Sequence, residues 1–203
     1  RKISNRINAV NRDKEFFDGD RNDGYGGYYY DGRWVKLAKK IINEYSIKNN
    51  SNLLHINSEK GFLLYDIHNL NPNINIFGVD SSKYCISNTK DEISKFVAQG
   101  DYLNLEFPDN YFDFVLAIGV VYAFNLKDAI KSINEIQRVS RDKSFITLAS
   151  YEALEDYFLF KKWTLLGTTI LKKNEWIDVL NFCNFKGDYY FTNAKTLNLR
   201  EKT

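Results

Sequence analysis

The residues of this chain best suited to bind a ligand follow two predicted strands. The apolar segment 53–56, interrupted by His55, leads into a polar loop, 57–61, which ends in Gly61. A second apolar segment ends at Asp80, whose carboxylate could accept hydrogen bonds from ribose hydroxyls. A glycine in such a loop lets the backbone approach a ligand and lets the next helix N-terminus face it. The layout predicts a site for a nucleoside-bearing cofactor, in a loop that has lost most of the expected glycines.

These residues depend on a sheet of strands covered by helices. Apolar segments alternate with segments whose apolar residues recur at helical spacing, such as Trp34, Leu37 and Ile41. The segment 111–119 is almost entirely apolar, as expected for a central parallel strand covered on both faces. Further strands are predicted from 96 to about 100, at 144–150 and at 188–192, the last at an edge, and helices at 1–14, 34–46, 126–139, 152–163 and 173–182. The predicted fold is a three-layer α/β sandwich.

Composition limits the classes of function. The formal net charge is +2 without a block of one sign, so we expect no nucleic-acid partner. No apolar run approaches the ~20 residues that span a bilayer, and we expect no membrane partner. Cys85 and Cys183 are predicted to be reduced, buried thiols, and the first residues lack a signal-peptide pattern, which favours the cytoplasm. His55 and His68 lack ligand spacing, so no metal is expected. The oligomeric state is left open.

The loop after the first strand resembles motif I of class I S-adenosylmethionine (SAM)-dependent methyltransferases. The family pattern is two hydrophobic residues, Asp, a hydrophobic residue, Gly, three residues and Gly. Here Leu53 and Leu54 fit, His55 replaces the Asp, Asn57 replaces the first Gly, and Gly61 matches the second. Asparagine tolerates positive φ better than other non-glycine residues. Glu59 and Lys60, at the start of the helix, are expected to cap it or to stay solvated.

Further segments are similar to this family over residues 50–150. The segment 72–82 looks like motif II, 100–101 like the turn whose acidic side chain meets the adenine amine, and 107–122 like the fourth strand. The resemblance implies a mostly parallel, Rossmann-like methyltransferase sheet and SAM as the cofactor. It places the cofactor against His55, Asn57, Gly61, Asp80, Ser81, Asp101, Tyr102 and Ile118.

His55 has two interpretations. The Asp of the family accepts hydrogen bonds from loop amides and helps to hold the amino-acid end of the cofactor. A neutral imidazole can accept one hydrogen bond but places no negative charge opposite an ammonium group. The alternative is a structural histidine at a strand end, satisfied by a backbone partner.

The N-terminal part differs from the rest of the chain in amino-acid composition. Residues 18–32 hold five glycines and four aspartates and are predicted to be irregular. We therefore predict an N-terminal helix and Gly/Tyr-rich arm at 1–33, and a methyltransferase-like domain at 34–203. The family resemblance implies that the arm covers the cofactor as a lid, and packing on the sheet edge is the alternative. Residues expected at the lid and substrate are Tyr25, Tyr28, Tyr30, Arg33 and Tyr122.

Two functions remain open from the sequence. The first is a SAM-dependent methyltransferase with a small-molecule acceptor, for which Tyr122 and Asp31 are the candidate general bases. The second is an inactive protein of the same fold that serves as a binding or regulatory partner, which the altered loop suggests. A different nucleotide is a third possibility, although Asp80 would repel a ribose 2′-phosphate.

Overall fold

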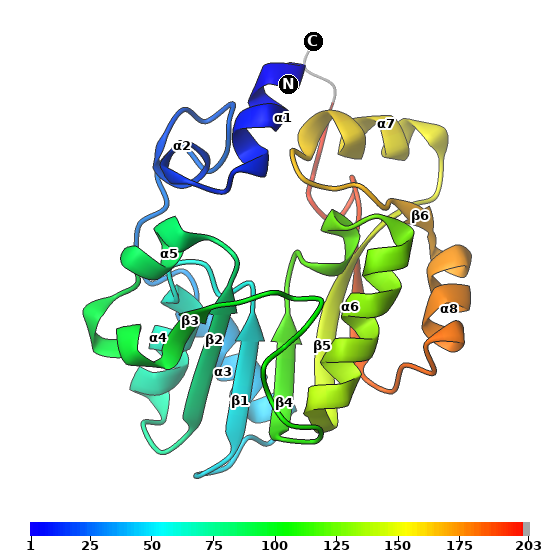
Figure 1. Ribbon diagram of the computed structural model, residues 1–203. Coiled ribbons are helices and arrows are strands. Elements are labelled where there is room, and N and C mark those ends of the chain that lie inside the picture. The colour runs from blue at the N-terminus through cyan, green and yellow to red at the C-terminus, as the bar shows by residue number, and fades with distance from the viewer. Residues whose placement is uncertain (201–203) are drawn as a thin grey trace.

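A computed structural model describes residues 1–200, except for the side chain of Asp142. Its centre is a seven-stranded sheet in the order β3-β2-β1-β4-β5-β6, with β7 also paired to β5 (Figure 1). All strand pairs described are parallel. The strands are β1 (Asn52–Ile56), β2 (Asn75–Asp80), β3 (Val97–Gln99), β4 (Phe112–Ala117), β5 (Ser140–Tyr151), β6 (Leu171–Lys172) and β7 (Asp188–Thr192). The prediction of a three-layer α/β fold with a mostly parallel sheet is confirmed.

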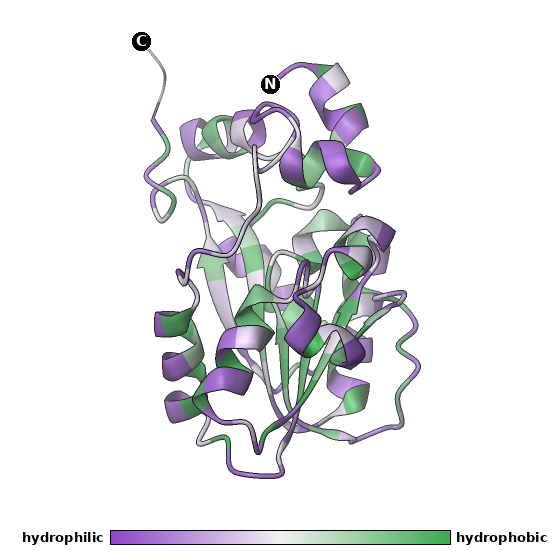
Figure 2. Cartoon of the chain, turned by 90° about the vertical axis from the view of Figure 1, so that its left-hand side faces the viewer, coloured by the Kyte–Doolittle hydropathy of each residue, from purple (hydrophilic) through white to green (hydrophobic). Residues whose placement is uncertain are grey.

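Helices cover both faces of this sheet. On one face, α3 (Val35–Glu44) and α4 (Phe62–Leu70) pack against side chains such as Phe114. On the other, α6 (Leu126–Val139) and α8 (Lys173–Phe182) pack against neighbours such as Val115. Alternate residues of β4 thus enter different cores, which explains why the strand is apolar throughout. Hydrophobic residues gather along the central sheet in Figure 2.

The helix predicted at 1–14 is divided into α1 (Ile3–Val10) and α2 (Lys14–Asp18). Arg12 lies between them with a left-handed φ of 48°, a conformation that a helix interior does not permit. Residues 19–34 then follow an irregular path, as predicted, before α3 begins. Phe17 of α2 and Tyr28 of the irregular segment pack with Phe62 and Cys85 in a small apolar cluster, which fixes the arm above the strand ends.

The remaining elements complete the carboxyl end of the sheet. Ser82 caps α5 (Lys83–Ser87) by accepting a hydrogen bond from the amide of Cys85. The 3-10 helices η1 (Asp91–Phe96) and η2 (Val121–Ala123) and the short strand β6 were not predicted. Helix α7 (Leu154–Trp163) lies near α1 at the top of the molecule (Figure 1). Both cysteines are free and buried, as predicted. Among residues 1–200, no helix has the length and apolarity to cross a bilayer.

Candidate active site

The loop after β1 keeps a glycine-like path despite its few glycines. The backbone φ angle is 63° at Asn57, 53° at Glu59 and 74° at Gly61. Such left-handed conformations cost a side-chain-bearing residue about 1–2 kcal/mol, with asparagine the most tolerant. The sequence has therefore added two side chains to the loop without straightening its backbone.

Asn57 connects the loop to the arm. Its Oδ1 accepts a hydrogen bond of 2.6 Å from the guanidinium of Arg12, and a longer one of 3.2 Å from the Tyr102 hydroxyl. Its amide nitrogen donates to the carbonyl of Ile118 at 3.2 Å. One side chain thus links the arm, the end of β4 and the turn after β3.

Glu59 and Lys60 also contact the arm. The Tyr25 hydroxyl donates to Glu59 Oε1 at 2.6 Å. Lys60 Nζ donates to Asp18 Oδ2 at 2.6 Å and to the Tyr28 carbonyl at 2.8 Å. Both loop residues are buried, and neither caps α4, so the expectation of solvated or capping side chains was wrong. The expectation failed because the arm supplies partners that the local sequence does not contain.

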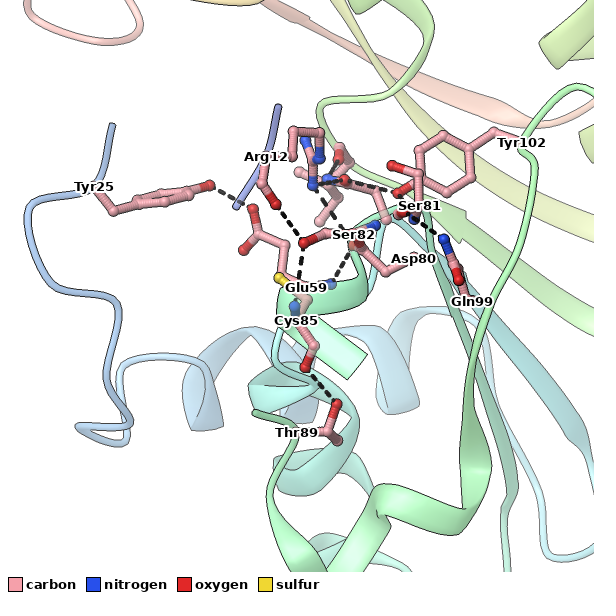
Figure 3. Close-up of polar contacts among 12 residues, drawn as sticks. Arg12, Tyr25, Glu59, Asp80, Ser81, Ser82, Cys85, Thr89, Gln99 and Tyr102 are labelled. Carbon is pink, nitrogen blue, oxygen red and sulfur yellow. Dashed lines mark hydrogen bonds and ion pairs between the residues drawn. The ribbon is translucent and has the colours of Figure 1, made fainter. Parts of the chain in front are cut away.

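Asp80 is fully buried at the end of β2. Its Oδ1 accepts from the amide of Ser82 at 2.8 Å, and its Oδ2 from the amide of Glu59 at 2.7 Å (Figure 3). The guanidinium of Arg12 stands 3.6 Å from Oδ2, and the Arg12 carbonyl accepts a hydrogen bond from Ser82 Oγ. Arg12 therefore covers the carboxylate that the sequence assigned to a ribose.

Two cavities meet at Arg12, Asn57 and Gly119, which line both. The first, of about 270 Å³, lies under the arm and the segment 163–167. The second, of about 410 Å³, opens beside Asp101. At Gly119, a Cβ would meet nothing closer than 3.8 Å, so this glycine leaves open space where the cavities join.

Most of the predicted site residues come together here. Those lining the first cavity are Tyr25, Tyr28, His55, Asn57, Ile118 and Tyr122. Those lining the second are Asn57, Ser81, Asp101 and Tyr102. Gly61 lines neither of these two cavities. A Cβ there would stand 2.5 Å from Ile93 Cδ1, so packing of α4 against η1 is the evident reason for this glycine.

Asp80 also lines neither cavity, because Arg12 covers it, and three further predicted residues lie apart from both. Asp31 and Arg33 pair with each other on the surface, with a shortest distance of 2.7 Å. The Tyr30 hydroxyl donates to Asp66 Oδ1 at 2.5 Å, on the side of α4. Asp31 remains a candidate base only by its sequence position, and its geometry offers no support for the role.

Burial controls the protonation of His55 and Tyr122. Burial lowers the pKa of His55 to about 4, and its Nδ1 has no hydrogen-bond partner among the described residues. The imidazole is therefore neutral at pH 7. Burial, with a smaller contribution from the charge of Glu59, raises the pKa of Tyr122 to about 12. Its hydroxyl is protonated at neutral pH and can donate a hydrogen bond, but it is not an available base.

Sequence reasoning missed Arg12 and gave Glu59 no site role. Arg12 stands in a polar stretch, Asn-Arg-Asp-Lys, with no motif around it. For Glu59, the available signal was its place in the short loop between Asn57 and Gly61, close to the predicted cofactor.

Comparison with known proteins agrees with the predicted domain and fold. Residues 55–148 match the family model described as a methyltransferase domain. The chain is 23% identical over 202 residues to phosphoethanolamine N-methyltransferase of Plasmodium falciparum, covering 89% of this chain and 74% of that protein. The solved YcgJ protein of Bacillus subtilis superposes with a TM-score of 0.60 at 18% identity, over 75% of this chain and 68% of that one.

The fold is also shared with an enzyme named for another reaction. The cyclase SpnF superposes with a TM-score of 0.58 at 20% identity, over 76% of this chain and 61% of that one. This likeness concerns the fold alone. The match at residues 55–148 is to a methyltransferase domain, which agrees with the family resemblance of the sequence.

Proposed function

We propose that this protein binds SAM and transfers its methyl group to a small-molecule acceptor. The observation that carries the proposal is the pair of adjoining cavities at the carboxyl ends of β1, β2 and β4, with Asp80 buried behind Arg12, which lines both. Open parallel sheets bind ligands outside the carboxyl ends of their strands. An elongated ligand with a nucleoside at one end suits two cavities that meet at a narrow point.

The residues present fit a nucleoside once Arg12 moves. Each oxygen of Asp80 accepts one backbone N–H, and a carboxylate oxygen can accept a second donor. Gly119 leaves room for a ligand at the junction. Ser81 and Asp101 offer polar groups around the second cavity, where the adenine would lie. The first cavity then receives the amino-acid end and the acceptor.

SAM supplies an activated methyl group on its sulfonium, and the protein contributes position. Residues of the arm and of the segment 163–167 line the first cavity. We propose that the arm, residues 1–33, acts as the lid over the domain at 34–203. The Tyr122 hydroxyl can hold an oxygen or nitrogen of the acceptor in line with the methyl group. Such alignment supplies much of the acceleration in a transfer between two bound molecules.

The size of the first cavity supports a small acceptor. At about 270 Å³, it lies near the lower end of the range for ligand pockets. A macromolecule could not enter it while the arm is closed. The relative from Plasmodium falciparum is named for a small acceptor, phosphoethanolamine, which supports the same size class.

Calorimetry with SAM and with S-adenosylhomocysteine tests the proposal. We expect both to bind, and free ligand at 100 times its dissociation constant should stabilise the fold by about 2.7 kcal/mol. The variant Asp31→Asn is the control, because Asp31 is paired on the surface outside both cavities. If neither ligand produces heat or a thermal shift, the proposal fails.

A binding partner without catalysis is the second candidate. Arg12 already bonds Asn57 and approaches Asp80, so the chain itself occupies positions that a ribose would need. The shared fold does not fix the reaction, because one fold hosts many functions. If Arg12→Ala still binds no SAM, this second function is favoured.

A further inference from the structure

Glu59 is a buried carboxylate without a charged partner. Its side chain is largely buried, with the residue 8% exposed, and its Oε1 accepts the Tyr25 hydroxyl at 2.6 Å. Among residues 1–200, no ion pair forms to Glu59. Burial raises its pKa, and the nearby charge of Arg12 opposes that rise only in part. Burying a carboxylate without a cation costs free energy, and a cationic ligand that binds beside it stabilises it.

The position of Glu59 indicates which cationic group of the ligand it would meet. Glu59 lines the first cavity, and Asp101 lines the second, with Asn57 at the junction. If the ribose lies at Asp80 and the adenine in the second cavity, the sulfonium and the amino-acid end must extend into the first. Glu59 supplies the only carboxylate among the described residues that line this cavity, whereas Arg1, Arg12 and Arg21 supply cations around it.

We propose that Glu59 binds the α-ammonium group of SAM. The inference rests on the proposed function and names a recognition residue for it. A loop position with left-handed backbone directs this side chain into the cavity, close to Tyr25 of the arm (Figure 3). The same carboxylate can hold the ligand ammonium and the Tyr25 hydroxyl, which links closure of the arm to occupation of the amino-acid end.

The test distinguishes binding of the amino-acid end of the ligand from binding of its adenosine end. S-Adenosylhomocysteine carries the ammonium group, whereas 5′-methylthioadenosine keeps the adenosine and sulfur and lacks the amino acid. In calorimetry, we expect Glu59→Gln to lower the affinity for S-adenosylhomocysteine about tenfold or more, as for a lost hydrogen bond to a charged group. The affinity for 5′-methylthioadenosine should change by less than about twofold, within the factor expected of a site that keeps its contacts.

Tyr25→Phe is the matched control. It removes the hydroxyl that bonds Glu59 and keeps the carboxylate. If Glu59 served only to hold the arm in place, both variants would change the affinities for the two ligands by the same factor. That result would overturn the inference. Equal binding of S-adenosylhomocysteine by Glu59→Gln and by the unaltered protein would also overturn it. Glu59 would then be a candidate to bind an amine of the acceptor instead.

Failure of the inference can be told from failure of the proposed function. If the unaltered protein binds neither ligand, the proposed function fails. If Glu59→Gln does not fold, as judged by thermal unfolding, Glu59→Asp replaces it, since this variant keeps the charge and withdraws it by one methylene. Selective weakening of S-adenosylhomocysteine by Glu59→Asp supports the inference, and equal effects on both ligands contradict it.

Discussion

At the scale of single residues, the junction of the two cavities brings buried polar groups into competition. Asp80 and Asn57 are the groups that a ribose would require, and Arg12 already binds one and lies beside the other. The competition is close because buried polar groups need partners in either state. A ligand must replace the contacts of Arg12 rather than enter an empty site.

The first prediction concerns Asp80. Asp80→Ala should weaken the binding of 5′-methylthioadenosine by about 1–3 kcal/mol, because hydrogen bonds from the ribose hydroxyls to a charged acceptor are lost. The same variant should lower the free energy of unfolding, since the amides of Glu59 and Ser82 lose their acceptor. Calorimetry and urea unfolding measure the two effects. An unchanged affinity, with Asp31→Asn as the control, would contradict the placement of the ribose.

The second prediction is a pH dependence from His55. Burial lowers the pKa of His55 to about 4, and the unfolded side chain titrates near its ordinary value of 6.5. The unfolded chain therefore binds more protons between these values, so the stability is complete above about pH 6.5 and falls toward pH 4. The slope is about 1.4 kcal/mol per pH unit.

Urea unfolding of the unaltered protein and of His55→Asn, from pH 7.5 to 4.5 in buffers of equal ionic strength, tests this. The difference between the two proteins removes the contribution of the carboxylates. A difference that stays constant with pH would show that the imidazole is not buried in its neutral form.

At the scale of elements, the arm and the loop after β1 behave as one unit. Three side chains of the loop bind the arm, through Arg12, Tyr25 and Asp18. Asn57, which replaces a glycine of the family pattern, is thus one of the residues that hold the arm. The arm can open only by breaking buried contacts, which would couple its motion to the occupation of the site.

The third prediction is that Arg12→Ala binds SAM more tightly. The variant removes the group that competes with the ribose and leaves Asp80 and Glu59 without a nearby cation, which favours a cationic ligand. We expect a gain of about tenfold, or about 1.4 kcal/mol, measured by calorimetry. Arg33→Ala is the control, because Arg33 carries the same charge in the same arm but pairs on the surface. Weaker binding would mean that Arg12 contacts the ligand.

The fourth prediction concerns the start of α4. Gly61 has a φ of 74°, and a Cβ there would stand 2.5 Å from Ile93 Cδ1. Gly32 has a φ of 76° with nothing within 4 Å of such a Cβ. Gly61→Ala should therefore destabilise the fold more than Gly32→Ala, by about 1–3 kcal/mol for the added overlap. Equal losses in thermal unfolding would show that only the backbone conformation matters.

At the scale of the whole molecule, the sheet sets the site and the arm closes it. The carboxyl ends of β1, β2 and β4 meet on one edge of a parallel sheet, below α1, α2 and α7 (Figure 1). Residues from both ends of the chain, such as Tyr25 and Trp163, line one cavity. Under the proposed function, this arrangement suits a small acceptor and requires the arm to move for SAM to enter.

The sequence by itself determined the layered sheet, the strand that ends at Asp80 and the irregular arm. These features could be predicted because apolar periodicity and glycine content record burial and turns within each segment. The resemblance to a methyltransferase family, carried by several short motifs in order, agrees with the match at residues 55–148. Which side chains share a cavity was predicted in part, because the strand ends of a parallel sheet must lie together.

Only the tertiary structure decided the position of Arg12 and the burial of Glu59. The contact of Arg12 with Asn57 joins residues 45 positions apart, and that of Glu59 with Tyr25 joins residues 34 apart. A polar residue in a loop has no local pattern that separates a buried partner from solvent. Its environment depends on which distant segment packs over it, and here Arg12 of the arm forms an ion pair with Asp80, whereas it acts on Glu59 without an ion pair among the described residues.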